Sequence, residues 1–391
     1  MKLIVIGLGQ CGGRVADEFA RLNQRAAMER KVFIMPGVFA VNTDATDLSG
    51  LSVIKPDYQH RILIGGRRTG GHGVGKVNEL GAEIAREDAD KIIDALRSTK
   101  NFYESDAFLI IAGSAGGTGS GSVAVVSNII KERYPDKPAY ALLVLPFEHE
   151  ERTEERTVYN AAVCLKSTYS VADAVFLVDN QRYIKKDASL RLNLSKINKL
   201  IVEPFYDLLC AGEEKEAKYV GSKTLDAGDI IQSLSGWTAI GCGYASIKKR
   251  GFLFSRSNDF RDRNREVHSG LKAVDEALSE LSMECDPRDA GRALFLTAAP
   301  AKEMSTGLVK EIGDWVRNLA PNAVIRNGDY PRKGGDLSVS LIFSELSDVG
   351  RIREYYRSTA SMTAILKQRD QETRTKLREI EELGRDIPSL L

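Results

Sequence analysis

The stretch FLIIAGSAGGTGSGS, residues Phe108–Ser122, decides the fold that the sequence predicts. Its first four residues are apolar and indicate a buried strand, and a helical pattern begins near Val123. Between strand and helix, glycines at positions 113, 116, 117, 119 and 121 let backbone N–H groups turn toward an anion. The free N–H groups of the next helix add its positive dipole end. The stretch therefore predicts a strand, a phosphate-binding loop and a helix.

This loop differs from that of P-loop NTPases, in which the pattern GxxxxGK[ST] supplies a lysine to the terminal phosphates. Residues 113–122 contain no lysine. An earlier segment, Gly7-x-Gly9-x-x-Gly12, fits the dinucleotide fingerprint GxGxxG, and Asp44 follows it. Asp44 lies 32 residues after Gly12, whereas the fingerprint places its acidic residue about 20 residues on. An NAD-binding Rossmann oxidoreductase is therefore an alternative, but it leaves the second glycine loop unexplained.

Composition is that of an ordinary globular protein. The chain has 391 residues, 43% of them hydrophobic and 28% charged, so two domains are expected. A net charge of +1 gives no indication of a nucleic-acid surface. No apolar run approaches the length of a membrane span, which is about 18 residues, and no signal peptide is visible, so we expect a cytoplasmic protein. Neither a disulfide framework nor a zinc site is expected, because the five cysteines are widely spaced and form no CxxC pair: Cys11, Cys164, Cys210, Cys242 and Cys285.

Apolar strands alternate with helical segments in the first half of the chain, which predicts a parallel sheet with ligands at the carboxyl ends of its strands. The expected strands there are 2–6, 38–41, 61–64, 108–111, 139–145 and 174–178, and the expected helices are 14–25, 78–97, 123–133, 153–168 and 194–211. The second half is mixed, with strands at 238–247, 293–298 and 337–343, helices at 262–281 and 306–319, and a charged helical stretch at 353–383.

The run Ala115–Gly121, AGGTGSG, matches at every position the signature loop [SAG]GGTG[SAT]G of the tubulin/FtsZ superfamily. Together with GQCGG and RTGGHGVGKVNELG, it most resembles the archaeal CetZ group. The resemblance implies the tubulin/FtsZ fold: an α/β, Rossmann-like parallel-sheet GTPase domain, a long central helix and a smaller α+β domain. The expected parts are a nucleotide-binding domain at 1–193, the central helix at 194–212, a synergy loop with its helix at 213–235, the α+β domain at 236–360, and a helix and tail at 361–391.

The resemblance also implies a guanine nucleotide site, with GTP or GDP and Mg²⁺ as cofactors and no metal ligand assigned. Glu150 takes the place of a ribose-binding glutamate, although acidic residues also favour the first turn of a helix. Asn180 takes the place of an asparagine that reads guanine, although asparagine is also common in turns. Leu194 stands where the family has a stacking aromatic residue. The full set of expected nucleotide-binding residues is Gly9, Gln10, Cys11, Gly12, Asn42, Asp44, Gly71, Gly73, Ala115, Gly116, Gly117, Thr118, Gly119, Ser120, Glu150, Asn180, Leu194 and Asn198.

Residues 222–230, SKTLDAGDI, resemble the synergy loop NxDxxD of FtsZ, with Thr224 in place of the asparagine. The resemblance implies that Asp226 and Asp229 act on the nucleotide of a neighbouring subunit in a polymer. The alternative is that Asp226 only caps a helix.

The function that the resemblance implies is a cytoskeletal GTPase that assembles head to tail with itself, hydrolyses GTP at the subunit interface and acts in cell shape. An FtsZ-type division GTPase and a nucleotide-binding scaffold without turnover are the alternatives. The final residues, Asp386–Leu391, resemble the FtsZ tail peptide that binds membrane adaptors.

Overall fold

The computed structural model describes residues 1–184, 190–246 and 260–361, and the side chains of 190–193 and 260–268 fall outside that description. The expected helical stretch 353–383 is described only up to residue 361, within a helix at 350–361. The tail Asp386–Leu391 lies outside the described residues.

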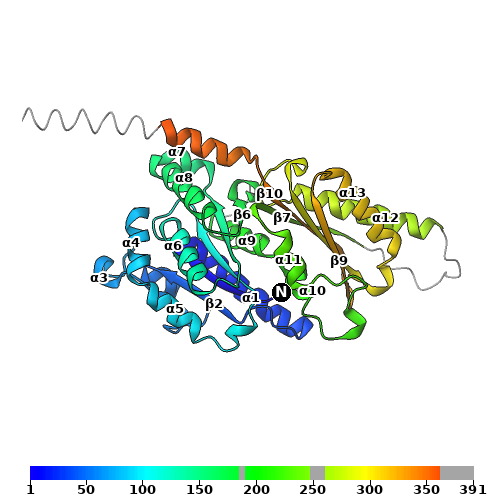
Figure 1. Ribbon diagram of the computed structural model, residues 1–391, viewed down its shortest axis with the longest axis horizontal. Coiled ribbons are helices and arrows are strands. Elements are labelled where there is room, and N and C mark those ends of the chain that lie inside the picture. The colour runs from blue at the N-terminus through cyan, green and yellow to red at the C-terminus, as the bar shows by residue number, and fades with distance from the viewer. Residues whose placement is uncertain (185–189, 247–259, 362–391) are drawn as a thin grey trace, which may run out of the picture.

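A single sheet of ten strands runs through the molecule in the order β3-β2-β1-β4-β5-β6-β7-β10-β8-β9 (Figure 1). Strands β1 to β6 are parallel, as predicted, while β10 runs antiparallel to its neighbours β7 and β8. The strands are β1 Leu3–Leu8, β2 Gly37–Asn42, β3 Arg61–Leu63, β4 Ala107–Gly113, β5 Ala139–Leu145, β6 Ala174–Asp179, β7 Gly236–Ala245, β8 Arg292–Pro300, β9 Val324–Arg332 and β10 Leu337–Leu346.

Helices cover both faces of this sheet and bury two apolar cores. One core contains α4, α5, α6 and α8, continuing under α12 and α13; the other contains α1, α9, α10 and α11. The helices are α1 Gly9–Arg30, α2 Ala45–Ser49, α3 Gly66–Thr69, α4 Asn78–Glu87, α5 Ala89–Arg97, α6 Thr118–Arg133, α7 Glu148–Thr153, α8 Glu155–Tyr169, α9 Leu190–Val202, α10 Phe205–Ala211, α11 Ala227–Ser233, α12 Phe260–Ser279 and α13 Thr306–Leu319, with a 3₁₀ turn η2 at Asn180–Tyr183.

The strand order reverses at β1. From β1 the chain adds β2 and β3 on one side, then returns to place β4, β5 and β6 on the other. The connections that leave β1 and β4 therefore diverge, and in open parallel sheets this reversal creates a crevice outside the carboxyl ends of the strands. Both glycine-rich segments begin at this point, because β1 ends at Leu8 and β4 ends at Gly113.

Several predicted helices differ from the structure. The first begins at Gly9 instead of Arg14, so the GQCGG segment forms the first turn of α1 and is not a loop. The predicted helix 78–97 is divided at Asp88, whose carboxylate accepts a hydrogen bond from Gly65 N at 2.6 Å. The predicted helix 194–211 is divided at Pro204, which lacks the N–H that a continuous helix requires.

The two halves of the sheet meet where β7 pairs with β6. Pairing extends over three residue pairs, Ala174 with Gly236, Val175 with Trp237 and Phe176 with Thr238. Beyond Phe176 the pairing with β7 stops, and at the end of β6 Asp179 N donates instead to the carbonyl oxygen of Ser282 at 2.8 Å. The seam between the halves of the sheet is thus short.

Candidate functional site

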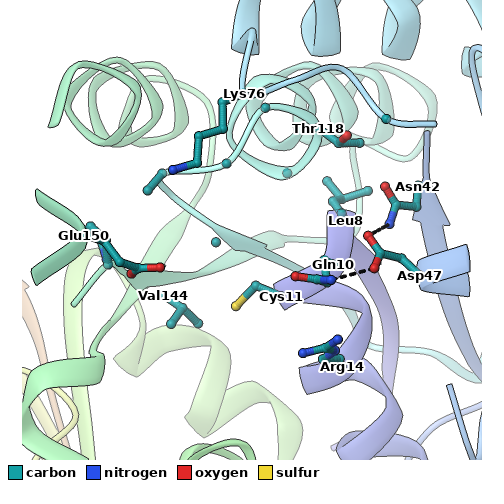
Figure 2. A pocket seen from close by; sticks show the side chains of 18 of the residues that line it. Leu8, Gln10, Cys11, Arg14, Asn42, Asp47, Lys76, Thr118, Val144 and Glu150 are labelled. Atoms are coloured by element: carbon teal, nitrogen blue, oxygen red, sulfur yellow. Dashed lines mark hydrogen bonds between the residues drawn. The ribbon is translucent and has the colours of Figure 1, made fainter. Parts of the chain in front are cut away.

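A cavity of about 380 Å³ lies at the carboxyl ends of β1, β4 and β5. Its lining comes from segments that are far apart in the sequence (Figure 2). Three of the expected nucleotide-binding residues, Gly12, Gly71 and Ser120, are not part of the lining. The expected residues that line it are Gly9, Gln10, Cys11, Asn42, Asp44, Gly73, Ala115, Gly116, Gly117, Thr118, Gly119, Glu150, Asn180, Leu194 and Asn198.

The signature loop meets the start of α1 at the floor of the cavity. Gly9 has φ 69°, which turns the chain directly from β1 into α1. A Cβ at Gly9 would lie 2.9 Å from the backbone nitrogen of Gly119, so only glycine permits this approach. Helix α6 begins at Thr118, five residues before the expected start. The free N–H groups of its first turn therefore belong to the signature loop itself.

The glycines of the signature loop have different roles. A Cβ at Gly116 would meet no atom within 4 Å, so this residue leaves open space on the cavity side. A Cβ at Gly121 would lie 2.0 Å from the carbonyl oxygen of Asn78, so Gly121 allows α6 to pack closely on α4. The interpretation that all five glycines expose amides to an anion is thus too broad, because Gly121 serves helix packing.

The buried side chain of Asn160, on α8, holds two loops together. Its Nδ2 donates to the carbonyl oxygens of Lys76 at 2.9 Å, Ala115 at 3.1 Å and Gly116 at 3.0 Å. The Lys76 carbonyl also accepts a bond from Arg156 Nε at 2.9 Å. These bonds fix the glycine-rich loop that follows β3 against the signature loop.

This arrangement brings a lysine into the cavity, although the signature loop has none. Lys76 lines the cavity with a left-handed backbone, φ 61°, and its ammonium group forms an ion pair with Glu154. Arg14, one turn into α1, is the second basic residue of the lining. Two cations and the amides of α6 therefore face the same cavity as the acidic Asp44, Asp47 and Glu150.

A hydrogen-bonded group of three side chains forms one wall (Figure 2). Asp47 accepts from Gln10 Nε2 at 2.6 Å and from Asn42 Nδ2 at 3.1 Å. Asp44 caps α2 through Oδ1, which accepts from the backbone nitrogens of Thr46 and Asp47. Its Oδ2 remains beside the glycine-rich loop near Gly73. This wall offers carboxylate and amide groups to a ligand.

The opposite end of the cavity is less polar. Leu194 and Asn198 both line it, as expected for residues four apart on one helix face. Burial raises the pKa of the Cys11 thiol to about 12, so this side chain stays neutral at physiological pH. Glu150 accepts from its own helix start, Phe147 N to Oε2 at 2.9 Å, and so caps α7 while it lines the cavity.

Asp226 and Asp229 lie elsewhere. Gly212 contacts the backbone of Asp226, and the next residue, Glu213, pairs with Lys2, which precedes β1. The cavity, in contrast, is lined by Leu8, the last residue of β1. A strand of six residues spans about 20 Å, so the two aspartates and the cavity occupy opposite ends of the sheet.

The start of α11 is held from β9, a strand that the sequence analysis did not predict. Buried Asp329 accepts from the backbone nitrogens of Ser222 at 2.9 Å and Lys223 at 2.6 Å. Asp226 caps α11 by accepting from Asp229 N at 2.8 Å, and Asp229 pairs with Arg326 at 2.9 Å. The predicted cap at Asp226 is therefore present, and the capping carboxylate is exposed.

The sequence analysis missed several residues of the site. Arg14 follows Gln10 by four positions, and Asp47 follows Asp44 by three, so helical spacing after each motif could have indicated them. Lys76 lies within the motif RTGGHGVGKVNELG, residues 68–81. Asn160 has no local signal, because it is one polar residue in an otherwise ordinary helix.

Comparisons with known proteins agree with this geometry. Residues 2–186 match the tubulin/FtsZ family GTPase domain, and residues 187–361 match the C-terminal domain of tubulin-like CetZ. The chain is 34% identical to tubulin-like protein CetZ1 of Haloferax volcanii over 370 residues, which is 90% of each chain.

Solved structures give the same result. The GDP-bound monomer of Haloferax volcanii CetZ1 has a TM-score of 0.79 at 30% identity and covers 93% of this chain and 100% of its own. The GTPγS-bound protofilament of CetZ2 from that organism has a TM-score of 0.79 at 27% identity and covers 94% and 100%. In the part of the chain that the structure describes, no helix has the length and apolar character that crossing a bilayer requires.

Proposed function

Because this chain belongs to the tubulin/FtsZ superfamily, in its CetZ group, we propose that it binds GTP and GDP in the described cavity and assembles head to tail into protofilaments. Hydrolysis of GTP takes place at the interface between two subunits. The polymer acts in the cytoplasm in the control of cell shape. The observation that carries the proposal is the separation of the cavity from Asp226 and Asp229 by the length of β1.

The cavity suits a nucleotide whose phosphates point toward α6. The first-turn amides of α6 and the open space at Gly116 accommodate phosphate oxygens, and Lys76 lies beside them. Glu150 is an acceptor for a ribose hydroxyl. Asn180 and Asn198 each offer a donor and an acceptor to the edge of a purine. Leu194 contacts the base through apolar surface in place of aromatic stacking.

The residues present also fit a magnesium ion that arrives with the nucleotide. Mg²⁺ is held in proteins by one or two carboxylates together with phosphate oxygens and water. Asp44 has a carboxylate oxygen, Oδ2, that its capping role does not use. The described residues contain no cluster of three acidic, histidine or cysteine side chains that would hold a metal alone. Mg²⁺ would be held by Asp44 and would neutralise phosphate charge.

Hydrolysis requires a group that orients water, and in the cavity lining the acids and Gln10 are already hydrogen-bonded or assigned to the nucleotide and its metal ion. Asp226 and Asp229 would supply it from the next subunit. The exposed carboxylate of Asp226 is free to contact another chain even while it caps α11. The pairing of Asp229 with Arg326 fixes its direction. A lone subunit should therefore hold GTP without rapid turnover.

A mixing experiment tests the in-trans assignment. Asp226→Asn keeps the helix cap, because asparagine caps as well as aspartate, but it removes the charge. Gly116→Val places side-chain atoms in the open phosphate space, where the added Cβ meets no protein atom within 4 Å. Each variant alone should lose GTP-dependent phosphate release, and a mixture of the two should recover part of it. Equal activity of Asp226→Asn and the unmodified protein would refute the catalytic role.

Two further readouts separate the alternatives. Thermal shifts with GTP, GDP and NAD distinguish a guanine nucleotide site from an oxidoreductase, since only the bound ligand raises the melting temperature. The family match to a GTPase domain favours the former. The specific rate of phosphate release, followed against protein concentration, should rise as filaments form. A flat rate without filaments under the electron microscope would indicate a scaffold or a different enzyme.

A further inference from the structure

The helix at 350–361 follows β10 and lies beside α7 and α8, on the GTPase part of the molecule (Figure 1). Arg351, in its first turn, reaches two different elements. One guanidinium nitrogen donates to Glu151 Oε1 on α7 at 2.6 Å. Its Nε lies 3.6 Å from Asp179 Oδ2, at the end of β6. The C-terminal helix thus joins α7 to the end of β6, two segments that also contact each other through a hydrogen bond from Glu148 N to Gln181 Oε1 at 3.5 Å.

Each of these partners is the immediate neighbour of a cavity residue. Glu151 follows Glu150, and Asp179 precedes Asn180, and both of those neighbours line the cavity. Arg351 itself does not line the cavity. The guanidinium therefore contacts the chain neighbours of Glu150 and Asn180, the residues to which we assign the ribose and the base.

Arg351 lies between two acids, Glu151 and Asp179, whose charges repel each other. Burial raises the pKa of Asp179, and the charge of Glu151 raises it further, while Arg351 opposes both effects. Asp179 Oδ1 also accepts from Gln181 N at 3.0 Å and so forms the start of η2. If the guanidinium were absent, the two carboxylates would lose the counter-charge that they share, and of the neighbouring charges only that of Arg182 would still oppose the raised pKa of Asp179; α7 and η2 would then separate.

Tyr355 completes the arrangement one turn further along the helix. Its hydroxyl donates to Glu151 and accepts from Arg351 at 3.1 Å, and its side chain is buried. The guanidinium lies over the Tyr355 ring, 5.1 Å from the centroid. The position of Arg351 is therefore set by packing, and its guanidinium holds Glu151 through a hydrogen bond and Asp179 through an ion pair at 3.6 Å.

We propose that Arg351 is a positioning residue of the nucleotide site: by bridging Glu151 and Asp179 it sets the spacing of Glu150 and Asn180, and so couples the C-terminal helix to recognition of the nucleoside. The inference rests on the proposed function, because it assumes that a guanine nucleotide occupies the cavity. The coupling is reciprocal, so a bound nucleotide also fixes the start of the helix at 350–361.

The test compares two ligands on each variant of the full chain. GDP and 2′,3′-dideoxy-GDP differ only in the ribose hydroxyls, from which Glu150 would accept hydrogen bonds. For the unmodified protein we expect the dideoxy ligand to bind about tenfold more weakly, the effect of losing a hydrogen bond to a charged group. For Arg351→Gln we expect GDP to bind about tenfold more weakly and the ratio between the two ligands to fall toward one, because Glu150 is no longer in place.

Matched variants separate positioning from simple loss of stability. Arg353→Gln changes an exposed arginine of the same helix whose ion pair among the described residues is with Asp348, and it should leave both affinities and their ratio unchanged. Arg351→Lys keeps the charge but loses the fork, so its ratio should also fall. Tyr355→Phe removes one donor to Glu151 and should give an intermediate ratio, which provides a reading even if Arg351→Gln does not fold.

The outcomes also separate this inference from the proposed function. If the unmodified protein binds neither GDP nor GTP, the proposed function fails. If the unmodified protein distinguishes the two ligands and Arg351→Gln and Tyr355→Phe distinguish them equally well, the proposed function stands and the positioning role of Arg351 is wrong.

Discussion

The buried amide of Asn160 should contribute measurably to the stability of the fold, and Asn160→Leu tests this. The substitution removes the donor to three carbonyl oxygens. The Lys76 and Gly116 carbonyls keep a second donor, from Arg156 and Ser120 respectively. The Ala115 carbonyl has no other donor among the described residues.

The cost follows from this difference. The orphaned carbonyl of the half-buried Ala115 costs about 1–3 kcal/mol, and each of the two lost but replaceable bonds costs about 0.5–1.5 kcal/mol. The gain is that leucine removes the Asn160 Oδ1, a buried acceptor without a partner, which returns about 1–3 kcal/mol. The balance is a net destabilisation of about 2 kcal/mol.

Urea unfolding of the nucleotide-free protein measures this value, with the slope of the transition checked against the unmodified protein. Asn128→Leu is the control, because Asn128 is exposed on α6 and bonds only to Glu132; its effect should stay within about 0.5 kcal/mol. Asn160→Leu should also weaken GDP binding, since the two loops must then be ordered by the ligand. An unfolding midpoint equal to that of the unmodified protein would refute the stabilising role of Asn160.

Three further predictions concern single residues. Lys76→Met should weaken binding of GTP about tenfold and of GDP much less, because the additional phosphate loses its counter-charge; equal losses in equilibrium titrations would place the ammonium elsewhere. Gly121→Ala should destabilise the protein by about 1–3 kcal/mol in thermal unfolding, because its Cβ would meet the Asn78 carbonyl; Gly66→Ala, in open space, should be nearly neutral. Burial alone would raise the pKa of Asp17, but hydrogen bonds from residues 52–54 hold it below its usual value. The stability that this depressed pKa confers is present above the unfolded pKa of about 3.9 and is lost as pH falls through the folded pKa, so Asp17→Asn should lower the unfolding free energy at pH 7 and flatten its decline in acid.

Much of the fold could be predicted from local sequence. Strands such as β4 and β5 are continuous apolar runs, and the alternation with helices was sufficient for the parallel sheet. The start of α1 was placed wrongly because glycines usually interrupt helices, whereas here Gly12 packs against the Ile111 carbonyl, where any Cβ would clash. Close contact between distant backbones is not visible in one sequence.

The candidate site was predictable wherever a motif follows a strand. The signature loop, Asn42 and Glu150 line one cavity because the strands that precede them end at one edge of the sheet. Asn160 and Arg351 escaped prediction, because their partners lie 44 and 200 positions away in the chain. Strand β9 escaped because RNGDYPR is polar and contains a proline, yet its buried Asp329 holds the start of α11.

The seam between β6 and β7 has a mechanical consequence. Three residue pairs are a narrow joint for a sheet of ten strands, and the aromatic stack of Tyr169 on Trp237, with centroids 4.4 Å apart, lies directly against it. In the filament that we propose, load would pass through this joint and through the two apolar cores that span both halves. The bending stiffness of the polymer would then be set inside each subunit as much as between neighbours, and a change at Trp237 would alter curvature without touching a nucleotide.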